Sequence, residues 1–407
     1  MARDGNGKNK AFRLPAILIA VWAAVLLIAF YANRGEDVGK IGQLFGNLGG
    51  WPLLGSGIFD SFVGAIIAML IAASWFGLGS LIASFITYSR MPNHSHILEL
   101  ALKTAVGAAA WSLVWFVLGF VGIYGSLVAV VALVVGFVTA ILALKRVREA
   151  KAESRVPEKA GAFDKALLVL IAIPTGLALI ASLGPPTAKD TLLYHFAVPK
   201  VFITQGGNSF VEGNIASYLA LGTEMHTVWA MLLGGSFSER AGEAAGGLVI
   251  WMFLPVLLMA IFGWARELMV NRRWSLIAVL MVATVPTVYH VSASAYIDVA
   301  LAVFITLAIY SLTRWWQTLE GGWLIFVAIF LGAALSAKLT TLFVIAAFVL
   351  MILLRLRKAQ GTEPDKLGKI AGLGFAALIL AGVIASPWYL RTWAETGTPV
   401  FPFYMSI

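Results

Sequence analysis

Long apolar runs recur along this chain, and they restrict its fold more than any other feature. A membrane-spanning helix needs about 20 consecutive apolar residues, and eleven stretches approach that length. They are Leu14–Ala32, Phe62–Tyr88, Ala105–Val121, Ser126–Leu144, Ala166–Leu183, Ala244–Ala265, Trp274–Val291, Ile297–Leu312, Trp323–Ala337, Leu339–Leu354 and Ile370–Tyr389. Charged residues make up only 12% of the chain, against about 25% in soluble domains. The sequence therefore predicts an all-α, polytopic membrane protein with about eleven transmembrane helices.

The distribution of basic residues orients these spans. Cytoplasmic loops carry an excess of lysine and arginine, and a cytoplasmic N-terminus leaves only seven of the 29 basic residues outside. These seven are Arg34, Lys40, Lys189, Lys200, Arg240, Lys338 and Arg391. The net charge of +9 therefore reflects topology, so we expect membrane lipids but no nucleic acid as partners. The chain has no cysteine, which excludes disulfides and thiolate metal sites.

One large outer loop, from Gly184 to Glu243, follows from this orientation. It contains an apolar segment, Ile215–Leu233, that approaches the length of a further span. Glu224 and His226 in its interior argue against exposure to lipid. Counting it as a span would also move several basic residues outside. We therefore expect a helix that lies on the membrane or re-enters it.

The beginning of the outer loop is the stretch richest in reactive side chains. It carries Lys189, Asp190, Tyr194, His195 and Lys200 directly after an apolar span. Asp190 has two interpretations. It is either the N-cap of a single helical turn, Thr191–Phe196, ended by Pro199, or a general base or positioning group for an acceptor hydroxyl. Tyr194 lies four residues on, hence on the same helical face, and His195 points elsewhere.

Other outer residues mark the ends of later spans. Tyr296 and Asp298 open the eighth span, where Asp298 is either a helix cap or a substrate contact. Lys338 lies at the turn between two short spans, and Arg391 follows the last one. Lysine and arginine bind phosphate well, although single residues at helix ends also reach toward lipid head groups. Taken together, the outer basic residues indicate a bound anion.

The histidine pattern gives no support for a zinc site. Glu224 and His226 lie two residues apart and face different directions on one helix, and the H-x-x-x-H spacing is absent. His94 and His96 are expected to be ordinary residues of a cytoplasmic connection. The chain also has no Walker loop and no G-x-S-x-G motif, which argues against nucleotide hydrolysis.

Several short motifs occur in a characteristic order along the second half of the chain. They are Asp190 with Tyr194-His195 and Pro199-Lys200, Tyr218 to Glu224, Ala295 to Asp298, Gly332 to Thr340, Ala385 to Tyr389 and Thr396 to Val400. In this order and on this side of the membrane, residues 166–404 resemble the GT-C superfamily of membrane glycosyltransferases. The similar branch uses sugars carried on polyprenyl phosphate and includes the protein O-mannosyltransferases and the aminoarabinose transferase of lipid A.

This resemblance implies a site and a reaction. Asp190 corresponds to the acid of the family's first outer loop, and Lys338 and Arg391 correspond to contacts for the carrier phosphate. A single displacement would invert the sugar at C1. The resemblance implies a polyprenyl-phosphate sugar donor, a protein, lipid or glycan acceptor, and a bacterial inner membrane with the catalytic loop outside. A divalent cation stays open. The expected substrate-binding residues are Lys189, Tyr194, His195, Lys200, Glu224, Tyr296, Asp298, Lys338 and Arg391.

The chain departs from the family pattern in two places. Many relatives place two acids together in the first loop, whereas here Lys189 precedes Asp190. The partner carboxylate is then Glu224, Glu212 or Asp298, or it is absent. The chain also stops at Ile407, where relatives often continue, so we expect a truncated, split or minimal form.

The first part of the chain lies outside the resemblance. We divide the sequence into a four-helix membrane module at 1–144, a charged cytoplasmic linker at 145–165 and a GT-C-like domain at 166–407. Two other functions remain as alternatives, a transporter or flippase of a lipid-linked or anionic solute and a scaffold that has lost its chemistry. Charges at the outer mouth, rather than at the middle of the bilayer, disfavour a transporter.

Overall fold

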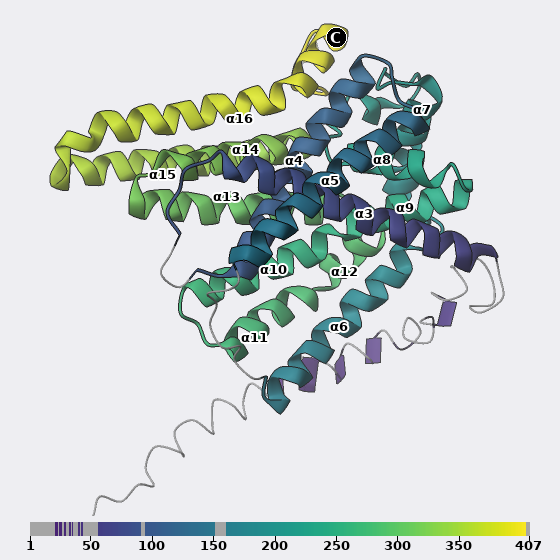
Figure 1. Ribbon diagram of the computed structural model, residues 1–407, viewed down its shortest axis with the longest axis horizontal. Helices are drawn as coiled ribbons and strands as arrows, with labels where there is room; N and C mark the ends of the chain where they lie inside the picture. Colours follow the sequence, from purple (N-terminus) through teal and green to yellow (C-terminus); the bar gives the residue numbers. More distant parts are fainter. Residues whose placement is uncertain are drawn as a thin grey trace, which may run out of the picture.

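The computed structural model describes residues 56–90, 94–150 and 160–403, with scattered positions between 21 and 43. Throughout these ranges the regular elements are helices, which form one bundle (Figure 1). The α-helices are α3 (Ser56–Ser84), α4 (His96–Phe120), α5 (Ser126–Ala150), α6 (Ala162–Ser182), α7 (Ala197–Gln205), α8 (Glu224–Gly234), α9 (Glu239–Trp251), α10 (Phe253–Glu267), α11 (Arg272–Ala283), α12 (Pro286–Ala293), α13 (Asp298–Thr318), α14 (Gly321–Ala337), α15 (Thr341–Thr362) and α16 (Leu367–Thr396). The short turns are η2 (Thr191–His195), η3 (Ile215–Tyr218) and η4 (Pro364–Lys366).

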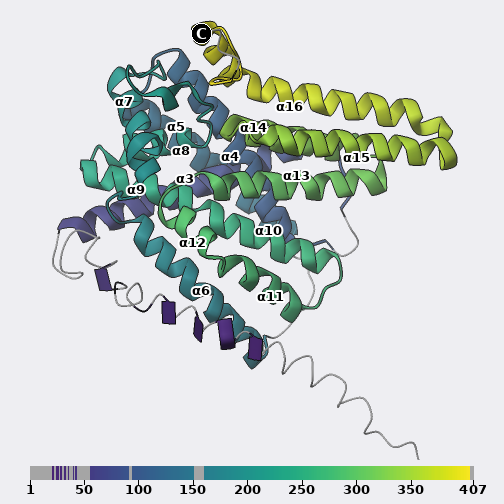
Figure 2. The ribbon, with the colours of Figure 1, turned by 180° about the vertical axis from the view of Figure 1, so that it is seen from behind.

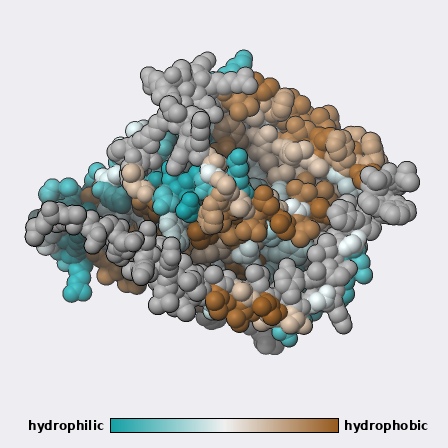
Figure 3. All heavy atoms as spheres, turned by 90° about the horizontal axis from the view of Figure 1, so that it is seen from below, coloured by the Kyte–Doolittle hydropathy of each residue, from teal (hydrophilic) through white to brown (hydrophobic). Residues whose placement is uncertain are grey.

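Many of the helices have the length and composition of membrane spans. Among the described residues, seven helical stretches are long and apolar enough to cross a membrane, or eight if a bent pair counts as one span. Several have little buried surface, and brown apolar side chains cover broad areas in Figure 3. The all-α, polytopic class is therefore confirmed. The number eleven stays a prediction, and the first predicted span, Leu14–Ala32, lies outside the continuously described residues.

Two predicted segments are not continuous helices. The stretch Trp274–Val291 was expected to be one span, but α11 ends at Ala283 and α12 begins at Pro286, with a bend of 64° between them. Proline disfavours a helical conformation in the residue before it, which explains the break. The outer segment Ile215–Leu233 is likewise divided into η3 and α8. Single helices at these two places were therefore wrong expectations.

The predicted pair of short spans around Lys338 forms two separate helices. α14 ends at Ala337 and α15 begins at Thr341. Lys338 itself has an extended backbone, with φ −156° and ψ 128°. Helices α13 to α16 run alongside one another and extend away from the rest of the bundle (Figures 1 and 2). The turn between α14 and α15 lies at the end of this group that faces the outer loop.

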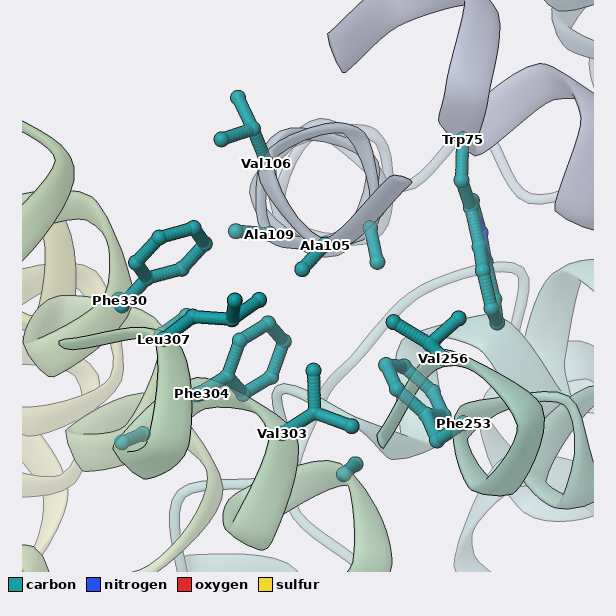
Figure 4. Close-up of a cluster of buried hydrophobic side chains, with 14 of the residues drawn as sticks. Trp75, Ala105, Val106, Ala109, Phe253, Val256, Val303, Phe304, Leu307 and Phe330 are labelled. Atoms are coloured by element: carbon teal, nitrogen blue, oxygen red, sulfur yellow. The ribbon is translucent and has the colours of Figure 1, made fainter. Parts of the chain in front are cut away.

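A continuous apolar core joins the N-terminal helices to the second half of the chain. Figure 4 shows Ala105 and Ala109 of α4 facing Phe304 and Leu307 of α13. The Trp229 indole of α8 donates a hydrogen bond to the carbonyl of Ala129 on α5, at 3.0 Å. Helices α3 to α5 therefore support the segments that carry the outer loop. A separate module ending at residue 144 stays a prediction, and the packing across that boundary is extensive.

Helices α3 and α4 approach each other at two glycines. A Cβ atom added at Gly107 would lie 1.7 Å from the carbonyl oxygen of Trp75, and one added at Gly79 would lie 1.7 Å from that of Lys103. Small residues let membrane helices pack backbone against backbone. The sequence of α3 and α4 therefore permits a contact that larger side chains would exclude.

Replacing Gly107 with valine is expected to destabilise the protein by about 1–3 kcal/mol, because overpacking forces helices apart. Thermal unfolding of the detergent-solubilised protein, followed by intrinsic fluorescence, measures the effect. Gly176→Ala in α6 is the matched control, since nothing lies within 4 Å of its added Cβ. Equal unfolding temperatures for the Gly107 variant and the control would contradict the close helix contact.

A polar network connects α4, α10 and α13 at the end of the bundle away from the outer loop. The Nε2 atom of His94 lies 2.7 Å from Glu99, and its Nδ1 atom lies 3.4 Å from Glu267. Tyr310 donates a hydrogen bond to the other oxygen of Glu267, at 2.9 Å. His96 is the first residue of α4, whereas His94 lies in the connection before this helix, as expected. The role of His94 follows from partners far along the chain.

Further charges surround the same network. Arg90 and Lys103 each lie 2.7 Å from Glu99. Burial opposes the charged form of His94, but its hydrogen bonds to Glu267 and Glu99 raise its pKa to about 9. A raised folded-state pKa contributes stability that is complete below the unfolded value, about 6.5, and disappears as the pH passes through 9.

The difference in unfolding temperature between wild type and His94→Gln is therefore expected to shrink between pH 6.5 and 9. The corresponding loss is on the order of 1–2 kcal/mol, after allowance for solvent screening. Thermal unfolding of both proteins across this range provides the measurement. A difference that stays constant with pH would mean that the charge of His94 does not stabilise the fold.

Candidate active site

A cavity of about 160 Å³ lies where the outer loop meets the ends of α13 to α16. The residues around it are Tyr194, Tyr218–Leu221, Glu224, Ile297, Ala337–Thr340, Trp388, Tyr389, Thr392, Pro399 and Phe401–Phe403. Its walls are mostly apolar, and a few polar groups reach it, as is typical of ligand sites. Three of the predicted substrate-binding residues, Tyr194, Glu224 and Lys338, line this cavity.

Glu224 and His195 form a buried pair beside the cavity. The Nδ1 atom of His195 lies 2.8 Å from Oε1 of Glu224, and both side chains are at most 3% exposed. His226 lies instead between Trp75 and Phe253, with ring centroids 4.8 Å and 5.7 Å away. The prediction that Glu224 and His226 face different directions is therefore confirmed.

Asp190 lies at the edge of this group and does not act as a helix cap. It precedes the π-helical turn η2, and its side chain makes no capping hydrogen bond. Its backbone N–H donates to the Tyr296 hydroxyl, at 3.3 Å. Pro199 does not end the turn, because it lies in the first turn of α7, where a missing N–H costs little. The cap interpretation of Asp190 is thus wrong, and a role of its half-buried carboxylate as a base or positioning group stays a prediction.

Tyr194 connects Asp190 to the buried pair. Its ring lies against that of His195, with centroids 4.0 Å apart. Burial raises the pKa of Tyr194, and the negative charges of Glu224 and Asp190 raise it further. Tyr194 is therefore a neutral phenol, which donates a hydrogen bond at any physiological pH.

Lys338 and Asp298 form an ion pair at the rim of the cavity. The Lys338 ammonium lies 2.8 Å from the Asp298 carboxylate, and both side chains are about half exposed. Asp298 is the first residue of α13, while the cap position belongs to Ile297. The cap interpretation of Asp298 is therefore wrong. The positive charge of Lys338 therefore lies beside the cavity and is paired with the negative charge of Asp298.

Arg391 is buried and holds the outer loop. It donates a hydrogen bond to the carbonyl of Ser217, at 3.0 Å, and its guanidinium lies 3.9 Å from the centre of the Phe210 ring. The neighbouring Thr392 hydroxyl donates to the carbonyl of Tyr218, at 2.8 Å. Arg391 is not among the residues that line the cavity. Among the described residues, its Nη2 atom has no hydrogen-bond partner.

The other two predicted lysines lie away from the cavity. Lys200 pairs with Glu239 at 2.9 Å and Glu243 at 2.7 Å. Burial opposes its charge, but these two hydrogen bonds raise its pKa, so Lys200 stays positive. Lys189 is exposed on the loop. The structure therefore gathers Asp190, Tyr194, His195, Glu224, Tyr296, Asp298 and Lys338, but not Lys189, Lys200 or Arg391.

Sequence reasoning missed the aromatic walls of the cavity. Tyr218, Trp388, Tyr389, Phe401 and Phe403 all line it. Tyr218 also stacks on Phe210, with centroids 4.3 Å apart. Several of these aromatic residues lie in or next to the short motifs of the second half of the chain, which could have indicated that they contact a ligand. In so apolar a chain, aromatic residues do not stand out as ligand contacts.

Metal-ligand geometry occurs at the opposite end of the bundle. In the described ranges, one group of side chains, His94, His96 and Glu99, has ligand atoms within 4.8 Å of one another. Arg90 and Lys103 already neutralise Glu99 there. The described carboxylates around the cavity do not form such a group of three. A divalent cation stays an untested expectation.

Replacing Arg391 with methionine is expected to loosen the outer loop, because the carbonyl of Ser217 loses its buried donor. Limited proteolysis should cut the loop faster, and the unfolding temperature should fall by several degrees. Arg357→Met on the exposed part of α15 is the matched control. Cleavage at the wild-type rate in the Arg391 variant would contradict this anchoring role.

Comparison with known proteins bears on the second half of the chain. Residues 244–396 match the family model described as dolichyl-phosphate-mannose-protein mannosyltransferase. The match extends from α9 to α16 and covers a little over a third of the chain, without the outer loop. No curated protein and no solved structure matches the chain. The matched family belongs to the GT-C superfamily of glycosyltransferases, so residues 244–396 are similar to the superfamily that the motifs resemble.

Proposed function

We propose that the protein moves a sugar from a polyprenyl-phosphate carrier to an acceptor hydroxyl at the outer face of the membrane. The observation that carries the proposal is the cavity, where the first outer loop meets the ends of helices from the matched region. A single loop acid or a single lysine could be explained by helix capping or by contact with lipid head groups. Lys338 lines the cavity together with Tyr194 and Glu224, and Asp190 lies beside this group through its hydrogen bond to Tyr296, which favours a shared role.

In the proposed reaction, Asp190 assists the attacking hydroxyl. The acceptor oxygen bonds to C1 of the sugar, the bond between C1 and the phosphate oxygen breaks, and the acceptor proton passes to the Asp190 carboxylate. One displacement inverts C1. The Tyr296 hydroxyl, which accepts from the backbone N–H of Asp190, fixes the loop at this point.

Lys338 is proposed to receive the charge of the departing phosphate. Its ammonium lies at the rim of the cavity, on the turn between α14 and α15. Preorganised positive charge at a leaving oxygen stabilises the transition state more than the ground state. Asp298 would hold the lysine in place before the donor arrives. The exposed apolar faces of α15 and α16 offer a path for the lipid tail.

Asp190→Asn is expected to reduce transfer by about 10²–10⁴-fold, the usual contribution of a general base. Polyprenyl-phosphate sugars, quantified by mass spectrometry in membranes from cells with wild type, a deletion or the variant, provide the measurement. The donor should accumulate equally in the deletion and in Asp190→Asn.

Asp365→Asn is the matched control, because this exposed aspartate lies in η4, outside the cavity. Cells carrying it should keep wild-type pools. Unchanged pools in the deletion strain would remove the support for a transferase. Accumulation in the deletion strain alone would exclude a base role for Asp190. Transfer by the detergent-solubilised protein, without two compartments, would exclude a transporter as the explanation.

A further inference from the structure

The pair of His195 and Glu224 has a feature that the proposed reaction does not use. Glu224 makes one contact with its Oε1 atom, to the Nδ1 atom of His195 at 2.8 Å. Its Oε2 atom is buried and has no hydrogen-bond partner among the described residues. A buried carboxylate oxygen left unpaired costs about 1–3 kcal/mol or more. A ligand group that donates a hydrogen bond would complete the bonding of this oxygen.

The position of Glu224 identifies where that ligand lies. Glu224 is the first residue of α8, and it lines the same cavity as Tyr194 and Lys338. The loop before it is fixed, since the backbone N–H of Gly222 donates to the carbonyl of Ser336, at 2.8 Å, and the Ser112 hydroxyl donates to the carbonyl of Gly222, at 2.6 Å. Glu224 therefore cannot move to the surface to hydrate its free oxygen.

His195 determines which oxygen stays free. The Nδ1 atom of His195 contacts Oε1 of Glu224, at 2.8 Å, so Oε2 is the oxygen that stays free. His195 is 2% exposed and is held between the rings of Tyr194 and Tyr296, with centroids 4.0 Å and 5.3 Å away. Its fixed ring therefore prevents the carboxylate from rotating.

We propose that Glu224, oriented by His195, accepts a hydrogen bond from one hydroxyl of the sugar that is transferred. The proposal rests on the proposed function. A carboxylate oxygen is the usual partner of a hydroxyl donor in a dry site. A cavity of about 150 Å³ holds one benzene ring, so the cavity of about 160 Å³ has the scale of one sugar ring. The aromatic walls would pack against the faces of that ring.

Glu224 thus contacts the substrate, and His195 is a positioning residue that acts through Glu224. The contact fixes the rotation of the sugar, so that C1 faces the acceptor side of the cavity. It also gives selectivity, because a site built to bind a hydroxyl rejects an analogue that lacks it.

The experiment uses the full-length protein in nanodiscs, with polyprenyl-phosphate mannose and the analogues that each lack one sugar hydroxyl. Binding is measured as the donor-induced shift in unfolding temperature, and transfer is measured as KM and kcat. For wild type, one analogue should bind about 10–100-fold more weakly than the parent donor. Glu224→Gln should weaken binding of the parent donor by a similar factor. It should bind that one analogue no more weakly than it binds the parent donor, because the contact is already lost.

His195 is tested with two variants. His195→Ala should weaken the same hydroxyl contact, while His195→Asn, which keeps an N–H donor near the Nδ1 position, should recover part of it. A purely structural role would lower the unfolding temperature and weaken every donor equally. Asp190→Asn serves as the comparison in the same assays, because it should bind the donor normally and fail only in transfer.

The outcomes separate this inference from the proposed function. If wild type neither binds nor transfers the parent donor, the proposed function fails. A second outcome is that wild type binds and transfers the parent donor, while Glu224→Gln loses the same affinity for each analogue as wild type does. The proposed function then stands, and the Glu224 contact is overturned. If Glu224→Gln does not fold, the analogue series on wild type and His195→Asn decides the question, since insensitivity to every hydroxyl would overturn the contact.

Discussion

A buried loop needs a hydrogen-bond partner for each of its backbone groups, and the candidate active site depends on how this chain provides them. Buried carbonyl and N–H groups without partners are rare because they are costly. Here the partners come from distant helices. On α16, Arg391 donates a hydrogen bond to the carbonyl of Ser217, and Thr392 donates one to the carbonyl of Tyr218. On α14, the carbonyl of Ser336 accepts a hydrogen bond from the backbone N–H of Gly222. The loop is irregular, but it has the fixed geometry of a core.

This anchoring gives the N-terminal helices an indirect part in the site. The Asn208 side chain of the loop donates to the carbonyl of Phe116, at 3.0 Å, and Ser112 on the same helix serves Gly222. The outer loop is therefore held between α4 on one side and α14 to α16 on the other. Residues outside the family match thus help to shape a cavity that the matched region partly lines.

The sequence was informative wherever one physical rule acted locally. Apolar length predicted most of the long helices, and the order of short motifs pointed to the superfamily whose family model matches residues 244–396. The outer side chains that converge, such as Asp190, Tyr194 and Lys338, could be chosen because polar groups at helix ends are rare in so apolar a chain. The bend before Pro286 was also visible in principle, since proline marks a break.

The remaining features depend on contacts between distant residues. Arg391 and Lys338 look alike in the sequence as basic residues beside an outer helix end. Only the fold shows that one guanidinium is directed into the loop and that the other cation lies at the cavity. The same holds for His94, whose partner Glu267 lies on a different helix, and for Glu224, whose partner is His195. Such pairings join residues far apart in the sequence, so the residues around each partner do not predict them.

The ion pair between Lys338 and Asp298 has a consequence for the catalytic cycle. The cavity carries its own counter-ion, so an incoming anion competes with Asp298 for the lysine instead of meeting an isolated positive charge. The competition lowers the affinity for every phosphate, substrate and product alike. In the proposed reaction, the same carboxylate would pair with Lys338 again after transfer and help to release the spent carrier. Such a site would bind its phosphate ligands more weakly and release its product faster.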